Sequence, residues 1–506
     1  MRKENLCNKG VRSLRGRPPL RSVPGFKHAW LALAALCLSL PPGTVALTSD
    51  LAHGEGLVSS SRLLTLDQAV ARALAHNHGL AAQKHAAKAA AWGQRQAQGR
   101  LLPSLSLESG YTRLDDETVA RANAFGTEMT TYFPDSTGAL IPYTIEIPQM
   151  VFRDGYYTSL SASLLLFNPS VWNAASLASA SRKAADSQLE STLQRTVYET
   201  LRSFVELLKI DSLVRIQEEH LSLARDNREQ AERLFKVGRY AEADVLRWRV
   251  QEVTQGQYLV QHQSARRVAA LALENLMGDT PLGSVAPDTL LPRALIGEIE
   301  WFCGADASSW DAFMSQPLDT VIAQNPDLRT LHTAVRMAEL EHRHRLISFF
   351  PSVTVGASYG WQENSTFVLD GEKTWAVSAN IKVPLFTGFT NISSRQVSKY
   401  NLMEAKDEAL ETKRSIFLAA EIARTAMRNY VEKLRLGEAR VASARRNYEI
   451  RKSSFDLGRL SNLEWLDAYI SLQAAKQSSA AAYYDLILAV ADYYQATGKI
   501  MVLAGK

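Results

Sequence analysis

The 506-residue sequence predicts a mainly α-helical protein with a small β part, built from two copies of one structural unit. Three observations predict this class. Long stretches rich in Ala, Leu and charged residues have helical periodicity and contain no proline. Short stretches alternate apolar residues with small polar ones, and both kinds of stretch occur twice in the same order. Hydrophobic residues make up 46% of the chain, which is ample for a folded core.

The first segment, residues 1–46, has the features of an export signal. Eight Lys or Arg and one Glu give it a charge of +7, so the total of +5 leaves about −2 for the rest. This location of the charge argues against a nucleic-acid partner. An apolar run from Trp30 to Leu40 is followed by small residues at Thr44 and Ala46, where a signal peptidase would cut. The long basic stretch leaves open a later translation start, or an apolar run retained as an anchor.

The repeat emerges when the chain is aligned with itself. Asn77 aligns with Asn325 at an offset of 248 residues, and Gly238 aligns with Gly458 at an offset of 220. The smaller offset places a longer loop in the first copy, between residues 111 and 156. We therefore expect a first repeat at 64–278, a linker or equatorial segment at 279–316, a second repeat at 317–500 and a short tail at 501–506.

Each repeat has the expected order helix, strand, loop, strand, long helix, turn and helix. Each long helix covers about 67 residues, or about 100 Å. The opening and closing helices are about half as long, so one stacked end to end on the other would match a long helix. The long helices are expected at about 170–236 and 390–456, the opening helices at about 66–100 and 318–349, and the closing helices at about 241–277 and 461–497.

Four segments alternate in the period-two pattern of β-strands. Their polar positions are mostly Ser, Gly and Thr, which suits a water-filled lumen, and their lengths suit an outer membrane crossed at a tilt. A soluble sheet with one face on a core is the alternative. The strands are expected at 104–111 and 158–167 in the first repeat, and at 352–360 and 374–385 in the second.

Four strands are too few to close a barrel, because about eight strands form the smallest ones. An open sheet in lipid would leave unpaired backbone groups at its edges, so closure must come from several chains. Three chains would give a trimeric 12-stranded β-barrel with four strands per chain, continued by a long periplasmic α-helical barrel. For the helices alone, an ordinary antiparallel coiled-coil protein is the alternative.

The sequence resembles the TolC family of bacterial outer-membrane efflux proteins over nearly the whole chain beyond the leader. The resemblance is carried by LTLDQAVARALAHN from Leu64, LLPSLSL at the first strand, VPLFTGF from Val383, and the turns at Gly238 and Gly458. It implies a homotrimer in the outer membrane that extends into the periplasm. It also implies a passive exit duct for drugs, small molecules or proteins, docked to a periplasmic adaptor and an inner-membrane RND or ABC-type pump in tripartite efflux or type I secretion.

The two glycine turns are the first candidate site. A left-handed glycine that ends a helix explains each turn without any further function. The resemblance makes these turns the periplasmic tips, which an adaptor can reach. The expected docking residues are Gly238, Arg239, Tyr240, Gly458, Arg459 and Leu460.

Acidic residues after the turns are the second candidate site. Glu464 and Asp467 are three residues apart on one face of the returning helix, where they could simply offset the helix dipole. In the TolC family, acids at matching positions ring the periplasmic mouth, and three copies of each would favour cations. Asp244 matches a family acid that ties neighbouring coiled coils shut, with Arg459 or Arg239 as its expected basic partner.

Aromatic residues near the strand ends are the third candidate, as girdles at the membrane surface or as simple loop packing. No H-E-x-x-H, P-loop or G-x-S-x-G motif occurs, so no enzyme, catalytic residue, cofactor or metal site is expected. The alternative function is a periplasmic coiled-coil adaptor or scaffold without a pore, which should lack the four strands. The girdle candidates are Tyr111, Tyr156, Tyr157, Trp361 and Trp375.

Overall fold

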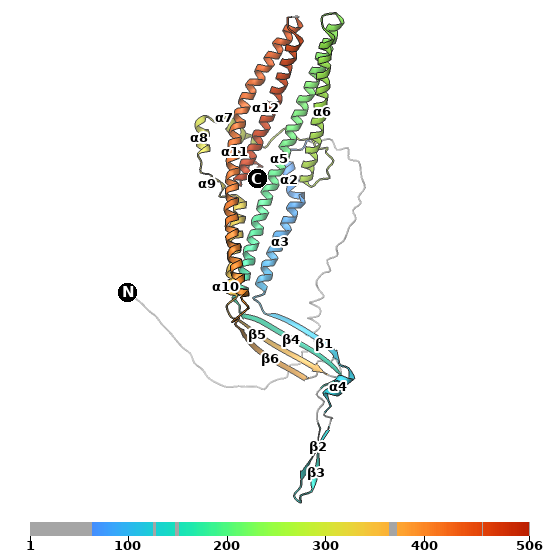
Figure 1. Cartoon of the computed structure of the whole chain (residues 1–506), viewed down its shortest axis with the longest axis vertical. Coiled ribbons are helices and arrows are strands. Elements are labelled where there is room, and N and C mark those ends of the chain that lie inside the picture. The colour runs from blue at the N-terminus through green and yellow to red at the C-terminus, as the bar shows by residue number, and fades with distance from the viewer. Residues whose placement is uncertain (1–62, 125–127, 147–150, 364–371, 458, 505–506) are drawn as a thin grey trace, which may run out of the picture. The chain divides into compact units, whose positions relative to one another are not determined.

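The computed structural model describes residues 63–124, 128–146, 151–363, 372–457 and 459–504, and the expected leader lies outside these ranges. Within them, most residues are helical, and the strands form a four-stranded antiparallel sheet and a separate two-stranded hairpin (Figure 1). Among the helices of this part of the chain, none combines the length and the hydropathy needed to cross a bilayer.

The two long helices are α5 (Pro169–Lys236) and α11 (Thr390–Asp456), with 68 and 67 residues. Each reverses into a shorter helix, α6 (Glu242–Met277) or α12 (Asn462–Ala496), and packs along it as an antiparallel hairpin. Pro169 suits the first position of α5, because the N–H that proline lacks would have no partner there. The two hairpins therefore have the lengths that the sequence predicts.

The opening helix of the first repeat is broken, although a continuous helix was expected. Helix α2 (Leu66–His76) ends at Asn77, and α3 (His78–Gly99) begins after it. Asn77 has an extended ψ of 118°, and its side chain accepts a hydrogen bond from the backbone N–H of Leu80 at 2.9 Å. The expectation was wrong because an asparagine side chain can satisfy helix N–H groups and so begin a new helix.

The second repeat has the same break at the aligned position. Helix α9 (Leu318–Ile322) is separated from α10 (Pro326–Ile347) by residues 323–325, and Asn325 has a ψ of 126°. The Asn325 side chain accepts from the N–H of Asp327 at 2.8 Å, and a proline again occupies the first helical position. Near the sheet, α3 packs on α5, α5 on α10 and α10 on α11, so four helices form a row.

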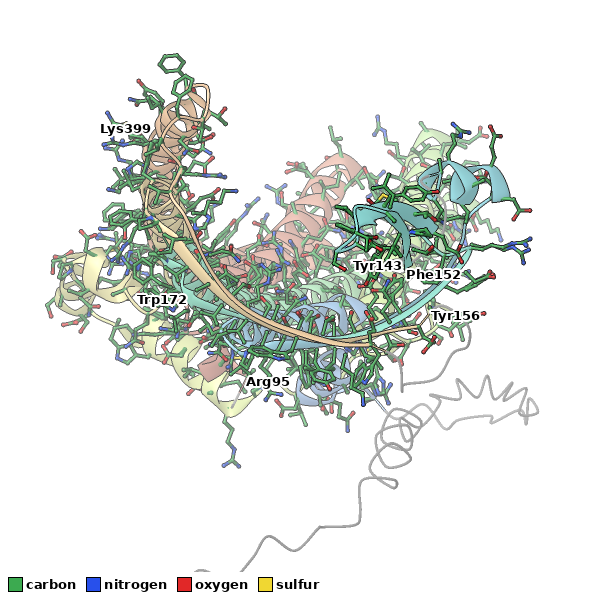
Figure 2. The ribbon with its side chains drawn as sticks, turned by 90° about the horizontal axis from the view of Figure 1, so that it is seen from below. Arg95, Tyr143, Phe152, Tyr156, Trp172 and Lys399 are labelled. Atoms are coloured by element: carbon green, nitrogen blue, oxygen red, sulfur yellow. The ribbon has the colours of Figure 1, made fainter. Side chains whose placement is uncertain are left out.

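The main sheet has the order β1 (Ser104–Arg113), β4 (Asp154–Phe167), β5 (Ser352–Glu363) and β6 (Glu372–Lys382), with every neighbour antiparallel. The last strand ends at Lys382, whereas it was expected to continue to residue 385. Pro384 explains this early end, because it has no N–H to donate to a strand ladder. The strands follow a common arc when seen from below (Figure 2).

The strand register brings the apolar positions of all four strands onto one face. Leu160 of β4 lies opposite Leu107 of β1 and Tyr359 of β5, and Ala357 lies opposite Val377 of β6. Leu105, Val377 and Ile381 on this face are 69%, 68% and 71% exposed in the single chain. The opposite face carries small polar side chains, among them Ser106 and Ser161, whose hydroxyls lie 2.7 Å apart. The sheet is therefore apolar on one side and small and polar on the other, as predicted.

The longer loop of the first repeat contains structure that the sequence did not predict. It holds α4 (Asp116–Ala122) and a hairpin of β2 (Glu128–Pro134) and β3 (Leu140–Glu146). Asp135 stabilises the hairpin turn by accepting hydrogen bonds from the N–H groups of Thr137 and Ala139 at 2.8 and 2.9 Å.

The expected linker and tail are also more ordered than predicted. The linker contains α7 (Arg293–Gly304) and α8 (Ala307–Met314), whose Phe302 and Trp310 are buried in the main core. The fully buried guanidinium of Arg424 on α11 donates to the carbonyl oxygen of Gln316 at 3.0 Å and so holds the linker. In the tail, α13 (Ile500–Leu503) buries both of its terminal residues. Apolar side chains at helical spacing explain why these segments fold onto the helices.

Candidate functional site at the helical turns and on the sheet

The turn between α5 and α6 is a Schellman motif. Gly238 has a φ of +71°, a conformation that side-chain-bearing residues rarely adopt. The N–H of Arg239 donates to the carbonyl of Leu234 at 2.9 Å, and the N–H of Gly238 donates to the carbonyl of Phe235 at 2.9 Å. These two bonds satisfy carbonyls that the helix end would otherwise leave unpaired.

The turn between α11 and α12 has the matching long bond. The N–H of Arg459 donates to the carbonyl of Ser454 at 2.9 Å, which is the equivalent of the bond from Arg239 to Leu234. Gly458 itself lies outside the described residues. Both turns lie at the same end of the helices (Figure 1).

The predicted tip residues divide into two groups. Arg239 and Arg459 are exposed, whereas Tyr240 and Leu460 are half-buried against the apolar cluster between the two hairpins. The most exposed apolar residues at the two turns are instead Val237, which is 68% exposed, and the aligned Leu457, which is 64% exposed. Sequence reasoning missed these two, although the repeat alignment places both immediately before the turn glycines.

Glu464 forms a capping box at the start of α12. Its carboxylate accepts from the Ser461 hydroxyl at 2.9 Å and from the Ser461 N–H at 3.2 Å, while Ser461 caps the N–H of Glu464. Arg451 of α11 lies 3.8 Å from the same carboxylate. The hydrogen bonds from Ser461 hold the pKa of Glu464 below its ordinary value. Glu464 therefore has a complete structural role within one chain.

Asp467 and Asp244 differ from Glu464 in their surroundings. Asp467 is exposed and forms no side-chain hydrogen bond or ion pair with any described residue. Asp244 is only 23% exposed, and its Oδ1 lies 3.3 Å from Arg247 and 3.2 Å from the amide of Asn462. The base beside Asp244 in one chain is thus Arg247 of its own helix, rather than the expected Arg459 or Arg239.

A cluster of large aromatic side chains, which sequence reasoning missed, joins the two hairpins near their turns. Trp248 of α6 and Trp465 of α12 are fully buried, with ring centroids 4.8 Å apart. Phe455 stacks on Trp465 at 4.3 Å, and Tyr240 packs edge-on against Phe455 at 5.3 Å. We call these residues, with Tyr469, the tip cluster. Its members lie on three helices and in the turn before α6, at mixed spacings that give no local sequence signal.

Beneath the tip cluster, His220 of α5 is buried with 1% of its surface exposed. Its ring nitrogens have no hydrogen-bond partner among the described residues, while its backbone carbonyl accepts from the hydroxyl of Tyr469 at 2.7 Å. Burial lowers the pKa of His220 to about 4, and the nearby charge of Lys476 adds to this effect. The imidazole is therefore neutral at neutral pH.

The aromatic side chains predicted to form girdles are divided between the two faces of the sheet. Tyr111 and Tyr156 lie opposite each other with ring centroids 4.8 Å apart, and the register places Trp361 and Trp375 on the same apolar face. Tyr157 does not belong to this group. It points to the polar face, where its hydroxyl donates to Glu108 at 3.1 Å, because adjacent residues of a strand face opposite sides.

A second set of aromatics, missed from the sequence, lies where the strands meet the helices. Phe167 packs edge-on against Trp172 at 5.3 Å, and Phe386 against Phe389 at 5.6 Å. Trp172 stands at the start of α5, and Tyr156 on the sheet (Figure 2). The apolar face is therefore flanked by aromatic side chains at both of its ends, as in a membrane-spanning sheet.

A sheet with one apolar and one small polar face, continued by long helical hairpins, defines the class of outer-membrane channels that end in a helical tube. The sequence matches the family described as outer membrane efflux protein over residues 69–279 and 318–499, one stretch in each repeat. The chain therefore belongs to this family of outer-membrane channel proteins, which confirms the resemblance, the two repeats and the outer-membrane location.

Two curated relatives have similar sequences. Outer membrane protein TolC of Vibrio cholerae serotype O1 is 23% identical over 353 residues, which cover 66% of this chain and 75% of the relative. Alkaline protease secretion protein AprF of Pseudomonas aeruginosa is 24% identical over 346 residues, which cover 66% of this chain and 68% of the relative.

Solved structures with the same fold include two outer-membrane proteins. The CmeC outer membrane channel of Campylobacter jejuni has a TM-score of 0.69 at 17% identity, covering 86% of each chain. The outer membrane protein VceC of Vibrio cholerae has a TM-score of 0.69 at 16% identity, covering 86% of this chain and 96% of that one. At these identities the likeness establishes the fold alone, and the fold is the one expected from the sequence.

Proposed function

We propose that three copies of this chain form one exit duct, with a closed 12-stranded barrel in the outer membrane and a helical tube in the periplasm. The observation that carries this proposal is the four-stranded sheet, whose apolar face is exposed and whose outer strands β1 and β6 each have one edge without a partner in the described chain. In lipid such edges must be paired, and copies of the same sheet can pair them.

The helices support the same assembly. In the row α3, α5, α10 and α11, the two outer helices each have a flank that no other helix of the row covers. A neighbouring chain would place its α3 beside α11 and so continue the wall. Charged side chains on these helices suit a wall with water on both sides.

The duct works passively in a tripartite system. A periplasmic adaptor would dock at the two turns, where Arg239, Arg459, Val237 and Leu457 form the exposed surface. An inner-membrane RND or ABC-type pump would supply the energy. The relative AprF bears the name of a protease secretion protein. We therefore propose two kinds of cargo, namely proteins in type I secretion and drugs or small molecules in efflux.

The periplasmic mouth would be lined by acids, and we propose that Asp467 matters more for selectivity than Glu464. Glu464 is engaged by Ser461 and Arg451, while Asp467 has no such partner among the described residues. Three uncompensated carboxylates at a constriction attract cations and repel anions. Asp244 would instead link the two hairpins of one chain through Asn462.

The test is purification from outer membranes, followed by mass measurement in detergent and conductance in a planar bilayer. A trimer that forms stable conducting pores is the expected result. A monomer without conductance would reject the duct and favour the alternative, a periplasmic adaptor or scaffold without a pore. The four strands of 10 to 14 residues already argue against that alternative.

A further inference from the structure

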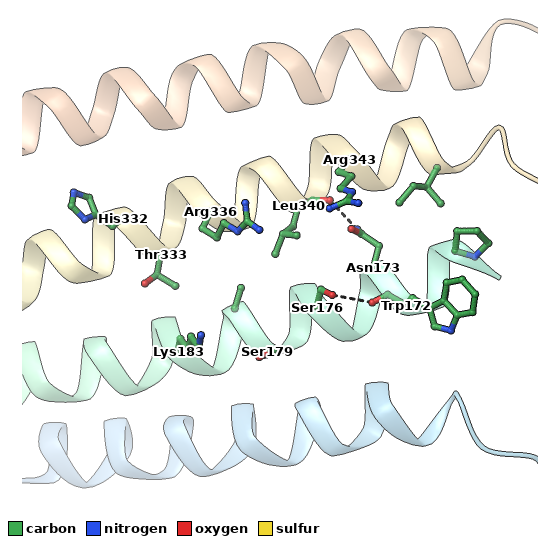
Figure 3. Close-up of a pocket in the computed structure, with 13 residues that line it drawn as sticks. Trp172, Asn173, Ser176, Ser179, Lys183, His332, Thr333, Arg336, Leu340 and Arg343 are labelled. Atoms are coloured by element: carbon green, nitrogen blue, oxygen red, sulfur yellow. Dashed lines mark hydrogen bonds between the residues drawn. The ribbon is translucent and has the colours of Figure 1, made fainter. Parts of the chain in front are cut away.

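A groove lies between α5 and α10 (Figure 3), at the ends of these helices that connect to β4 and β5. It encloses about 600 Å³ and is lined by 13 residues, which include Lys183, His332, Arg336 and Arg343 but no acid. The side chain of Asn173 on α5 is buried and donates a hydrogen bond to the carbonyl oxygen of Leu340 on α10 at 2.9 Å, which joins the two helices at the groove. The groove is therefore formed by two directly bonded helices and has a basic lining.

The positive charge of the groove is only partly neutralised by nearby acids. Glu339 pairs with Arg336 at 3.0 Å, and Glu341 pairs with Arg345, which lies outside the groove lining. Arg343 and Lys183 form no ion pair with any residue in the described part of the chain. An anion entering the groove would supply the missing countercharge.

The groove lies on the lipid side of the protein wall. Phe167 is opposite Val353, and Val353 is opposite Ile381, so Phe167 shares the apolar face of the sheet. Trp172, which lines the groove, packs on Phe167 at 5.3 Å. The apolar face of the sheet is thus continuous with the membrane-proximal end of the groove. Because α5 and α10 are the inner helices of their row, a neighbouring chain would leave the groove open.

The depth of Arg343 matches a lipid headgroup. It lies four residues, about 6 Å, before the end of α10 at Ile347, and residues 348–351 then connect α10 to β5. The polar layer of a bilayer is about 5–8 Å thick on each side. Lys183 and Arg336 lie further from the sheet, where they add positive potential rather than direct contacts. Tryptophan commonly lies at this level of a membrane protein.

We propose that this groove binds the phosphate of an anionic phospholipid from the periplasmic leaflet, between Arg343 and Trp172. The acyl chains would lie along the apolar face beside Phe167, and the headgroup would extend toward Arg336. The inference rests on the proposed membrane barrel, because it requires the sheet to be in lipid. A site of this kind would fix the height of the trimer in the bilayer.

The test uses the full-length trimer in neutral detergent, titrated with phosphatidylglycerol and followed by native mass spectrometry. Arg343→Gln should weaken binding about tenfold, as expected for the loss of one charge-assisted contact. Arg343→Lys should retain most of the affinity, and Lys183→Gln should have a smaller effect. Arg345→Gln is the matched control, because it removes the same charge two residues away and outside the groove.

Two further titrations distinguish the source of the anion. Phosphatidylcholine should bind more weakly than phosphatidylglycerol, and inorganic phosphate at millimolar concentration should not displace the lipid. Equal binding of phosphatidylglycerol to Arg343→Gln and Arg345→Gln would overturn the proposal, as would displacement by free phosphate. Conductance of the same samples separates the two hypotheses. If the trimers conduct and Arg343→Gln does not change lipid binding, only the lipid site in the groove is rejected. If the wild-type protein does not conduct, the proposed duct is rejected.

Discussion

Trp248 donates a hydrogen bond from Nε1 to Oδ1 of Asn462 at 2.7 Å, and this bond joins the closing helices of the two repeats near their turns. Asn462 in turn donates to Asp244 at 3.2 Å, so a chain of three polar groups runs through the buried tip cluster. A periplasmic end that opens by separating its hairpins would have to break this chain. The bond is therefore a specific point at which opening can be tested.

Trp248→Phe should loosen the turns without removing the aromatic packing. It leaves the buried Oδ1 of Asn462 without its donor, which typically costs about 1–3 kcal/mol. We expect faster hydrogen exchange in residues 224–250 and 459–472 and a larger fraction of open time in single-channel recordings. Trp301→Phe, at an exposed site on α7, is the control. Unchanged exchange at the turns would show that the bond does not restrain the hairpins.

His220 makes the stability of the hairpin pair depend on pH. Burial lowers its pKa in the folded chain to about 4, below the ordinary 6.5, so the folded state binds fewer protons than the unfolded state between these values. Stability should therefore be complete above about pH 6.5 and fall as the pH drops toward 4. The ring faces Tyr469 and lies near Lys476 and Glu219.

The measurement is the unfolding temperature of the trimer from pH 7.5 to pH 4. His220→Phe keeps an aromatic ring that cannot gain a proton, so its profile should be flatter than that of wild type. His85→Phe, at an exposed position, is the matched control. Parallel profiles for wild type and His220→Phe would contradict the assignment.

The parts of the fold that the sequence predicted are those with regular periodicity. The long helices α5 and α11 and the faces of the four strands follow from patterns of 3.6 and 2 residues. The breaks at Asn77 and Asn325 were missed because a single capping asparagine does not interrupt an apolar pattern. The site was predicted less well. Glu464 was interpreted from the sequence as a pore acid, and the structure places its carboxylate on Ser461. The spacing of Ser461 and Glu464 is that of a capping box, and this sequence signal was missed.

Asn77 and Asn325 stack the opening helices on the closing ones in the same way. Their amides donate to the carbonyls of Leu276 and Ala496, at 2.9 and 2.8 Å, near the ends of α6 and α12. Asn77→Ala should lower the unfolding free energy by about 1–3 kcal/mol, through loss of the cap and of this bond. Thermal unfolding in detergent measures the change.

Asn77→Asp separates the two roles of this side chain. It keeps the oxygen that caps α3 but replaces the donor to Leu276 with a second acceptor. If stacking matters, Asn77→Asp should destabilise nearly as much as Asn77→Ala. Wild-type stability in Asn77→Asp would mean that only the cap contributes. Equivalent variants of Asn325 test the same idea in the second repeat.

The mouth acids can be compared by neutral, nearly isosteric replacements. Asp467→Asn should reduce the ratio of cation to anion permeability, because in the proposed trimer it would remove three carboxylates from the mouth of the pore. Glu464→Gln should change this ratio less, because the charge that it removes is already engaged by Arg451. Glutamine can still complete the capping box with Ser461, so the turn should stay intact. Reversal potentials in asymmetric potassium chloride measure both. A larger effect of Glu464→Gln would assign the selective ring to Glu464.

The two faces of the sheet can be distinguished by adjacent substitutions in β6. Val377 is on the apolar face and Ser378 on the opposite one, so arginine at the first position would face lipid and at the second the lumen. A lipid-facing arginine costs about 2–4 kcal/mol at the bilayer centre, once in each chain of the proposed trimer. Val377→Arg should therefore reduce the yield of folded trimer in the outer membrane. Ser378→Arg should assemble normally but shift conductance toward anions, and a normal yield of Val377→Arg would mean that this face does not contact lipid.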